Sequence, residues 1–302
     1  MESITKTITA EEDGLTVRQI MRRKLYFSAR GVSRLTRLET GIMLNGVKAI
    51  VTEVVHEGDE LRLEIDDQRE PKHRCVPGDW PLDIVWEDEY LIVINKPAGM
   101  ASHIKNLEPG TPNVGGALAA RNGTDDFIFH PVNRLDLSTS GLMIVAKSAY
   151  IHDRLQRMIH GRRFQREYRA ICLGRPDPPT GVIKAKIGRD ETSIVARMVR
   201  EDGSRCVTTY EMLAASDTKI GTLSLMRLLP LTGRTHQLRV HMAHIGCPIA
   251  GDDLYGGAVK FIGRPALHSC KITLFHPIKE EWMNFSSPLP ADMRRIVKAA
   301  RF

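Results

Sequence analysis

The pattern of apolar and polar positions divides the chain into two parts. In the first part, apolar residues recur at helical spacing from Val17 to Leu25 behind Thr16, a typical N-cap residue, and Ser33 is expected to cap a second helix. The pair Asn45-Gly46 suits a tight hairpin turn. The strand-like runs around that turn are Ile42–Leu44, Val47–Val55 and Leu61–Ile65. We therefore predict two short helices followed by a small sheet.

Strand-like patterns dominate the second part of the chain. They recur at 83–86, 91–94, 142–145, 168–172, 207–210 and 223–226. Helical patterns interrupt them at 150–159 and from near Thr235. Because strands and helices do not alternate strictly, we predict an α+β fold, with a mostly antiparallel mixed sheet and flanking helices preceded by a small α/β domain. The expected boundaries are a tail at 1–13, a small domain at 14–65, a linker at 66–80 and a large domain at 81–302.

The composition is that of an ordinary soluble chain, with 42% hydrophobic and 26% charged residues among 302. No apolar run approaches the roughly 20 residues that a membrane helix needs. The first residues lack the basic-then-apolar plan of a signal peptide, so we expect a cytoplasmic protein. Five scattered cysteines, an odd number without a Cys-x-x-Cys pair, favour reduced thiols over disulfides or a cysteine zinc site.

The net charge of +7 is concentrated in one segment of the small domain. Between Gly14 and Lys48 there are eight basic residues and one acidic residue, whereas the rest of the chain has 35 of each. A concentrated basic face is typical of proteins that bind a phosphate backbone, although a solvated helix surface stays open as an alternative. The residues that we expect to bind RNA are Arg22, Arg23, Lys24, Arg34 and Arg37.

Candidate chemistry begins with the segment His130–Gly141, which runs directly into an apolar strand. Within it Arg134 lies two residues from Asp136, on a loop fixed to a rigid element, where reaction sites often occur. Spacing alone still favours a turn-forming role for Asp136, because serine and threonine follow it. Two further blocks bear on that choice: Phe164–Ala170, with Tyr168 at the start of a strand, and Leu231–Gly246, with a Gly-Arg-Thr turn at the mouth of a helix followed by Gly251–Gly256.

Together with Asn95–Gly99, these blocks resemble, in the expected order, the RluA-type pseudouridine synthases from about Ile84 to Pro290. The resemblance implies that Asp136 is the catalytic aspartate, that Tyr168 is the tyrosine of the second block, and that Arg234 pairs with Asp136. We expect all three to be catalytic, with Tyr168 stacking on the uracil face and accepting the ring proton that leaves. The order of the small domain, from Gly14 to Ile65, resembles a small RNA-binding module first described in a small-subunit ribosomal protein.

The activity that the resemblance implies is the isomerisation of uridine to pseudouridine in structured RNA, with ribosomal RNA favoured over transfer RNA. No cofactor and no metal are expected, and we expect a monomer. Arg134 is expected to fill the space that a flipped nucleotide leaves, and Asn133 and Leu238 are expected to contact the substrate. Asn133 and Arg166 stand where family members usually have histidine and lysine, so they mark positions where target choice can differ.

Three alternatives remain. Tyr168 could anchor the sheet as a half-buried strand aromatic. The chain could be a non-catalytic RNA-binding protein, which the presence of Asp136, Tyr168 and Arg234 argues against. A metal-dependent RNA hydrolase would use His236, His241 and His244, but the chain has no His-Glu-x-x-His arrangement near them.

Overall fold

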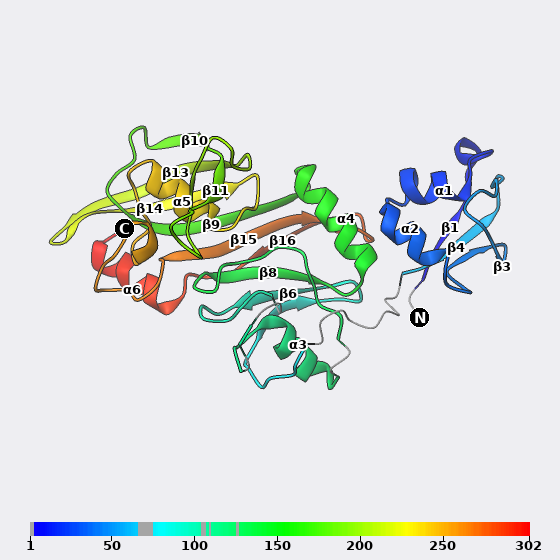
Figure 1. Ribbon diagram of the computed structural model, residues 1–302, viewed down its shortest axis with the longest axis horizontal. Helices are drawn as coiled ribbons and strands as arrows, with labels where there is room; N and C mark the ends of the chain where they lie inside the picture. The colour runs from blue at the N-terminus through cyan, green and yellow to red at the C-terminus, as the bar shows by residue number, and fades with distance from the viewer. Residues whose placement is uncertain (1–2, 66–74, 104–106, 109, 125–126) are drawn as a thin grey trace.

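The computed structural model describes residues 3–65, 75–103, 107–108, 110–124 and 127–302, which form a small N-terminal domain and a large one (Figure 1). Most of the predicted linker, 66–74, lies outside the described residues. Its last residues pack on the large domain, because the backbone amide of Gly78 donates to the carbonyl of Gly116 and Trp80 lies against the core. No helix among the described residues is long and apolar enough to cross a membrane.

The small domain is a four-stranded antiparallel sheet in the order β1-β4-β2-β3, covered by short helices. Its strands are β1 Ser3–Thr7, β2 Ile42–Leu44, β3 Val47–Lys48 and β4 Glu60–Glu64. The expected tail at 1–13 is therefore wrong for its described part, because β1 pairs along its whole length with β4. The predicted hairpin is confirmed, since Asn45 and Gly46 have φ angles of 52° and 79°.

The helices of the small domain begin at capping residues. They are η1 Ala10–Glu12, α1 Val17–Gln19, η2 Ile20–Lys24 and α2 Ala29–Leu35. Thr16 caps as predicted, because its hydroxyl accepts from the backbone of Gln19, whose side chain accepts in return from the backbone of Thr16. The expected cap at Ser33 is wrong: Ser28 takes that role by accepting from the amide of Gly31 at 3.0 Å, and Ser33 lies inside the helix.

The large domain is built on a ten-stranded sheet in the order β10-β13-β14-β9-β15-β8-β6-β5, with β16 paired to β15 and β7 to β8. Among the described residues its pairings are antiparallel except that of β15 with β8, so the predicted mixed, mostly antiparallel sheet is confirmed. The strands are β5 Asp83–Glu87, β6 Leu91–Lys96, β7 His130–Pro131, β8 Ser140–Ala146, β9 Phe164–Leu173, β10 Thr180–Lys184, β13 Val207–Thr218, β14 Gly221–Pro230, β15 Leu267–Phe275 and β16 Trp282–Ser286. A separate hairpin joins β11 Ile187–Arg189 to β12 Arg197–Val199.

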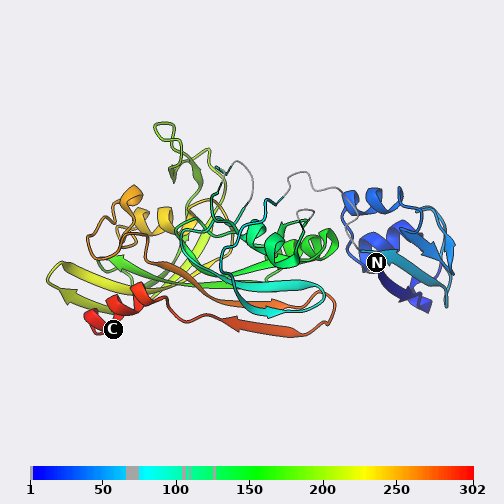
Figure 2. The same cartoon turned by 90° about the horizontal axis from the view of Figure 1, so that it is seen from below.

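Strands β6 and β8 are apolar over most of their length because each is buried on both faces. The small domain and the C-terminus lie at opposite ends of the sheet (Figure 2). Along β6, Ile92 and Ile94 belong to one core and Leu91 and Val93 to the other, as the two-residue period of a strand requires. The helices are α3 Val114–Asn122, α4 Ala149–His160, α5 Gln237–His244, η3 Asp253–Tyr255 and α6 Ala291–Ala300. Of these, α4 lies between the large sheet and the small domain, where it contributes to the second core.

Candidate active site

Asp136 lies on the loop that connects β7 to β8, and that loop is fixed through its backbone. Its four consecutive carbonyl groups from residue 135 to residue 138 each accept a hydrogen bond. The donors are the Ser102 hydroxyl (2.6 Å, to Leu135), the Thr139 amide (3.0 Å, to Asp136), the Gly99 amide (2.8 Å, to Leu137) and Arg264 Nη1 (3.2 Å, to Ser138). A loop held in this way presents its side chains in one geometry, which is what a reaction site needs.

A lysine lies buried beneath the same loop. Lys96, at the end of β6, is fully buried, and its Nζ donates to the carbonyl oxygens of Pro97 and Met100 at 2.8 Å and of Leu137 at 3.4 Å. Burial lowers the pKa of Lys96 to about 7, although the charge of Asp136 acts in the opposite direction. The sequence assigned no role to Lys96 within the block Asn95–Gly99, whereas the structure places it among the supports of the loop.

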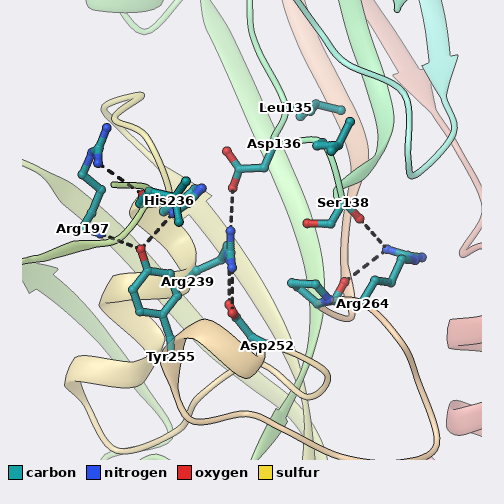
Figure 3. A network of polar contacts seen from close by, with 12 residues as sticks. Leu135, Asp136, Ser138, Arg197, His236, Arg239, Asp252, Tyr255 and Arg264 are labelled. Carbon is teal, nitrogen blue, oxygen red and sulfur yellow. Dashed lines mark hydrogen bonds and ion pairs between the residues drawn. The ribbon is translucent and has the colours of Figure 1, made fainter. Parts of the chain in front are cut away.

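The carboxylate of Asp136 faces a buried arginine, Arg239 on α5 (Figure 3). Arg239 Nη1 lies 3.8 Å from Asp136 Oδ2, while Nε and Nη2 each donate to the fully buried Asp252 at 2.7 Å. Burial opposes the charge of Arg239, but the two hydrogen bonds to Asp252 and the charges of both carboxylates raise its pKa. The bidentate bond to Asp252 fixes the plane of the guanidinium and directs its remaining nitrogen towards Asp136.

This pairing corrects the prediction that Arg234 is the partner of Asp136. Arg234 lies in the turn before α5, exposed to solvent, and its backbone amide donates to the Gln237 side chain at 3.1 Å. It lines the same cavity as Asp136 without forming an ion pair with it among the described contacts. The reason is helical geometry: Arg239 lies within α5 on its buried side, next to Asp252, whereas Arg234 precedes the helix and is exposed.

A tyrosine and a histidine extend the network around Arg239. The Arg239 guanidinium lies 5.0 Å from the centre of the Tyr255 ring. The Tyr255 hydroxyl accepts from the Arg197 amide at 2.9 Å and lies 2.8 Å from His236 Nδ1. Burial lowers the pKa of His236 although the Asp136 charge opposes this, so the imidazole is neutral at pH 7. These contacts connect the β11–β12 hairpin to the arginine that faces Asp136 (Figure 3).

The loop, β9 and the start of α5 enclose a cavity of about 370 Å³. The predicted site residues that line it are Asn133, Arg134, Asp136, Tyr168, Arg234 and Leu238. Tyr168 is 6% exposed, and burial raises its pKa although Arg166 acts against this, so its hydroxyl stays protonated at neutral pH. The structure therefore brings the predicted side chains together around one cavity, with Tyr168 and Leu238 as apolar walls and Arg134 at an exposed edge.

Asn133 differs from its predicted role as a substrate contact. Its Oδ1 accepts from the Ile144 amide at 2.9 Å, and its Nδ2 donates to the Leu142 carbonyl at 3.4 Å. The side chain is 4% exposed and is used to hold the loop against β8, which corrects the expectation that its amide is offered to a substrate. Arg166 is likewise engaged, because its Nη2 lies 3.4 Å from the carbonyl oxygens of Pro230 and Thr232 in the cavity wall.

Of the three histidines that suggested a metal site, His241 and His236 have other partners, and His244 is exposed at the end of α5. His241 is fully buried, with Nδ1 2.9 Å from the Thr208 hydroxyl and Nε2 3.2 Å from the Ala185 carbonyl. His236 forms a hydrogen bond between its Nδ1 and the Tyr255 hydroxyl. Within the part of the chain that the structure describes, no group of three or more histidine, cysteine, aspartate or glutamate residues is placed to hold a metal ion.

The basic residues of the small domain fall into two groups. Arg23, Lys24 and Arg37 are exposed. Arg22 donates from Nη1 to the Phe27 carbonyl at 2.7 Å, and Arg34 is half-buried in a cavity between the two domains. Arg22 is exposed as well, so four of the five predicted RNA-binding residues lie on the surface, whereas Arg34 is only partly exposed at the junction with the large domain.

A carboxylate beside a buried arginine, in a cavity large enough for one nucleotide base, makes this cavity the candidate active site. The family model described as RNA pseudouridylate synthase matches residues 90–244, about half of the chain. The chain therefore belongs to the RNA pseudouridylate synthase family, as its resemblance to RluA-type enzymes predicted. It is an isomerase that acts on RNA.

Similar proteins extend over nearly the whole chain. An uncharacterized RNA pseudouridine synthase of Bacillus subtilis is 36% identical over 281 residues, covering 91% of this chain and 98% of that protein. The ribosomal large subunit pseudouridine synthase D of Escherichia coli strain K12 is 31% identical, over 99% of this chain and 94% of that one. Among solved structures, human RNA pseudouridylate synthase domain containing 1 is 26% identical, with a TM-score of 0.58 over 74% of this chain and 96% of that one.

Proposed function

We propose that the chain isomerises specific uridines of structured RNA, with ribosomal RNA favoured over transfer RNA as the target, and that Asp136 is its catalytic residue. The observation that carries this proposal is the position of the Asp136 carboxylate, at a nucleotide-sized cavity and 3.8 Å from a buried arginine that Asp252 orients. Relatives named as ribosomal large subunit pseudouridine synthases support ribosomal RNA as the target class.

The reaction breaks the bond between ribose and a ring nitrogen of uracil, rotates the base and forms a bond from ribose to a ring carbon. The ring carbon loses its proton and the released ring nitrogen gains one, so atoms and charge balance without an oxidant or reductant. Asp136 either attacks the sugar or the base, or removes a sugar proton to start the cleavage. In each case Arg239 places a positive charge next to the carboxylate and restricts its direction.

The other cavity residues would bind and orient the base. A uridine within paired or stacked RNA must be flipped out to reach Asp136, at a cost of a few kcal/mol. Arg134, at the exposed edge of the cavity, is placed to fill the vacated space and to contact phosphate. Because the Tyr168 hydroxyl stays protonated, stacking on the uracil face fits Tyr168 better than acceptance of the departing proton, with Leu238 as a further apolar wall.

The test replaces Asp136 by Asn and compares pseudouridine maps of total RNA. The strains carry the wild-type chain, the Asp136→Asn variant, the Asp253→Asn variant or no gene. Asp253 is a matched control because it is an exposed aspartate outside the cavity lining. We expect sites that disappear both without the gene and in Asp136→Asn but persist in Asp253→Asn.

Two results would contradict the proposal. Sites that persist in Asp136→Asn would exclude Asp136 as the catalytic residue. Sites that do not depend on the gene at all would favour a non-catalytic RNA-binding protein. Sites found in transfer RNA instead of ribosomal RNA would correct the target class and leave the site assignment intact.

A further inference from the structure

A second cavity, of about 240 Å³, lies at the junction of the two domains. The small domain contributes one wall and the large domain the other, so neither domain forms this cavity alone. The residues from the small domain are Phe27, Ser28, Arg30, Gly31 and Arg34, and those from the large domain are His130, Ala149, Tyr150, His152 and Asp153.

Specific contacts fix the two walls relative to each other. Tyr150, in the first turn of α4, donates from its hydroxyl to the Leu25 carbonyl at 3.0 Å, and its ring centre lies 4.3 Å from that of Phe27. Both aromatic side chains are buried, with exposed fractions of 3% and 1%. Arg157 Nη2 donates to the Phe27 carbonyl at 3.2 Å, where Arg22 also donates. The junction therefore has apolar packing and directed hydrogen bonds, so the cavity is a built feature.

The charges around the cavity favour an anion. Arg30 and Arg34 are four residues apart on α2, so they lie on one side of that helix. The acid in the lining is Asp153, whose charge is already compensated: burial opposes ionisation, but hydrogen bonds with His152 and Ser28 and the charge of nearby Arg157 lower its pKa. A positively charged cavity smaller than the roughly 300–1,000 Å³ of typical ligand pockets suits one phosphodiester group with its sugar.

This cavity shares a wall with the active-site cavity. On β7, His130 lines the cavity at the junction, whereas its neighbour Pro131 lines the active-site cavity. On α4, His152 lines the cavity at the junction and Gln156 lines the active-site cavity, and the two side chains lie 3.4 Å apart. An RNA strand whose uridine occupies the active site would therefore pass the junction within a few nucleotides.

We propose that the cavity between the domains binds a backbone phosphate of the RNA strand near the target uridine, and that it exists only while the small domain is docked on α4. This inference rests on the proposed function. It adds that the basic small domain acts through a defined subsite whose position relative to Asp136 is set by Tyr150 and Phe27. The distance between the two cavities would then contribute to the choice of uridine.

The test is a double-mutant cycle on the binding of a single-stranded, labelled oligouridylate of about 12 nucleotides to the full chain. The subsite variant is Arg30→Gln with Arg34→Gln, and the matched control is Arg23→Gln with Arg37→Gln, two exposed arginines that do not line the cavity. Each is measured with and without Tyr150→Ala, which is expected to release the small domain. Small-angle scattering checks the release, and Arg157→Met is a second releasing variant if Tyr150→Ala unfolds.

We expect the subsite variant to weaken binding about tenfold when the domains are docked and less than twofold when they are released. The control variant should weaken binding by the same factor in both states. A subsite variant that binds like the wild type, or that weakens binding equally in both states, would overturn the inference. Because this assay needs no turnover, its failure is distinguishable from failure of the proposed function, which the Asp136→Asn maps report.

Discussion

The arginines of the large domain and those of the small domain are used in opposite ways. Arg239 and Arg166 are buried and each is held by specific oxygen atoms; Arg239 faces Asp136, and Arg166 lines the active-site cavity. Arg23 and Arg37 are exposed on the helical side of the small domain. Buried charges are costly unless they are paired, so they fix a geometry, whereas exposed charges generate a field that salt screens. Under the proposed function, catalytic geometry therefore depends on the buried arginines of the large domain, and attraction of RNA depends on the exposed arginines of the small domain.

The strongest test of this contrast is the replacement of Arg239 by Met. It leaves Asp252 buried without a partner, so we expect the free energy of unfolding to fall by about 3–5 kcal/mol. Pseudouridine formation by the folded fraction should fall by about 100-fold or more, because Asp136 is then without the charge that orients it. Chemical denaturation and single-turnover assays measure the two effects.

Arg234→Met is the matched control for that experiment. Arg234 lines the same cavity from an exposed turn, so its replacement should change the free energy of unfolding by no more than about 0.5 kcal/mol. Equal decreases in the two variants would mean that burial does not separate their roles. A larger decrease of activity for Arg234→Met than for Arg239→Met would restore Arg234 as the partner of Asp136.

The correction of the partner of Asp136 from Arg234 to Arg239 also indicates how much of the site the sequence alone can predict. Ordered motifs identified the segments that meet at the site, because each contains a polar cluster next to a strand or helix. They did not identify which arginine faces Asp136, since that depends on the rotation of α5 and on its contact with Asp252. The run Gln237-Leu238-Arg239 followed by Gly251-Asp252 carried the signal, but spacing alone does not reveal a pairing across a turn.

The same distinction between local patterns and distant pairings applies to the fold. Strands and helices with clear periodicity, such as β6, β8 and α4, were predicted near their observed positions. The role of β1 was missed because its five residues are only partly buried and are held by pairing with the distant β4. The role of Lys96 was missed for a related reason: two of its carbonyl acceptors, on Pro97 and Met100, are local, but the third, on Leu137, belongs to a loop that reaches Lys96 only in the folded chain.

Lys96 is a buried amine whose hydrogen-bond acceptors, among the described residues, are carbonyl oxygens and not carboxylates, so it extends the contrast between buried and exposed charges in a measurable way. Its pKa is lowered from 10.5 to about 7 in the folded state. Between those values the unfolded chain binds more protons, so the free energy of unfolding should rise with pH, by at most about 1.4 kcal/mol per unit from this group. The cost of burying the charged lysine is complete below pH 7 and is relieved as pH approaches 10.5.

Denaturation of Lys96→Met at pH 7 and pH 9 tests this effect. Other groups titrate in the same window, so the informative quantity is the difference in pH dependence between the variant and the wild type. We expect a flatter dependence in Lys96→Met, whereas Lys219→Met, in an exposed turn, should follow the wild type. If the free energy of unfolding of Lys96→Met has the same pH dependence as that of the wild type, then Lys96 has the same pKa in the folded and unfolded states.

The smallest effect on stability, and the one most sensitive to salt, is expected at the exposed arginines. Arg23→Gln with Arg37→Gln should leave the free energy of unfolding within about 0.5 kcal/mol of the wild type, since neither side chain is buried. RNA binding should weaken at low salt, and the slope of log affinity against log salt should become shallower by about 0.7 for each phosphate of single-stranded RNA that the variant no longer neutralises. Filter binding of the oligouridylate across a salt series measures this slope. An unchanged slope would show that these arginines form only a solvated face. The attraction of RNA would then depend on the junction cavity and the active site, and the contrast between the arginines of the two domains would not hold.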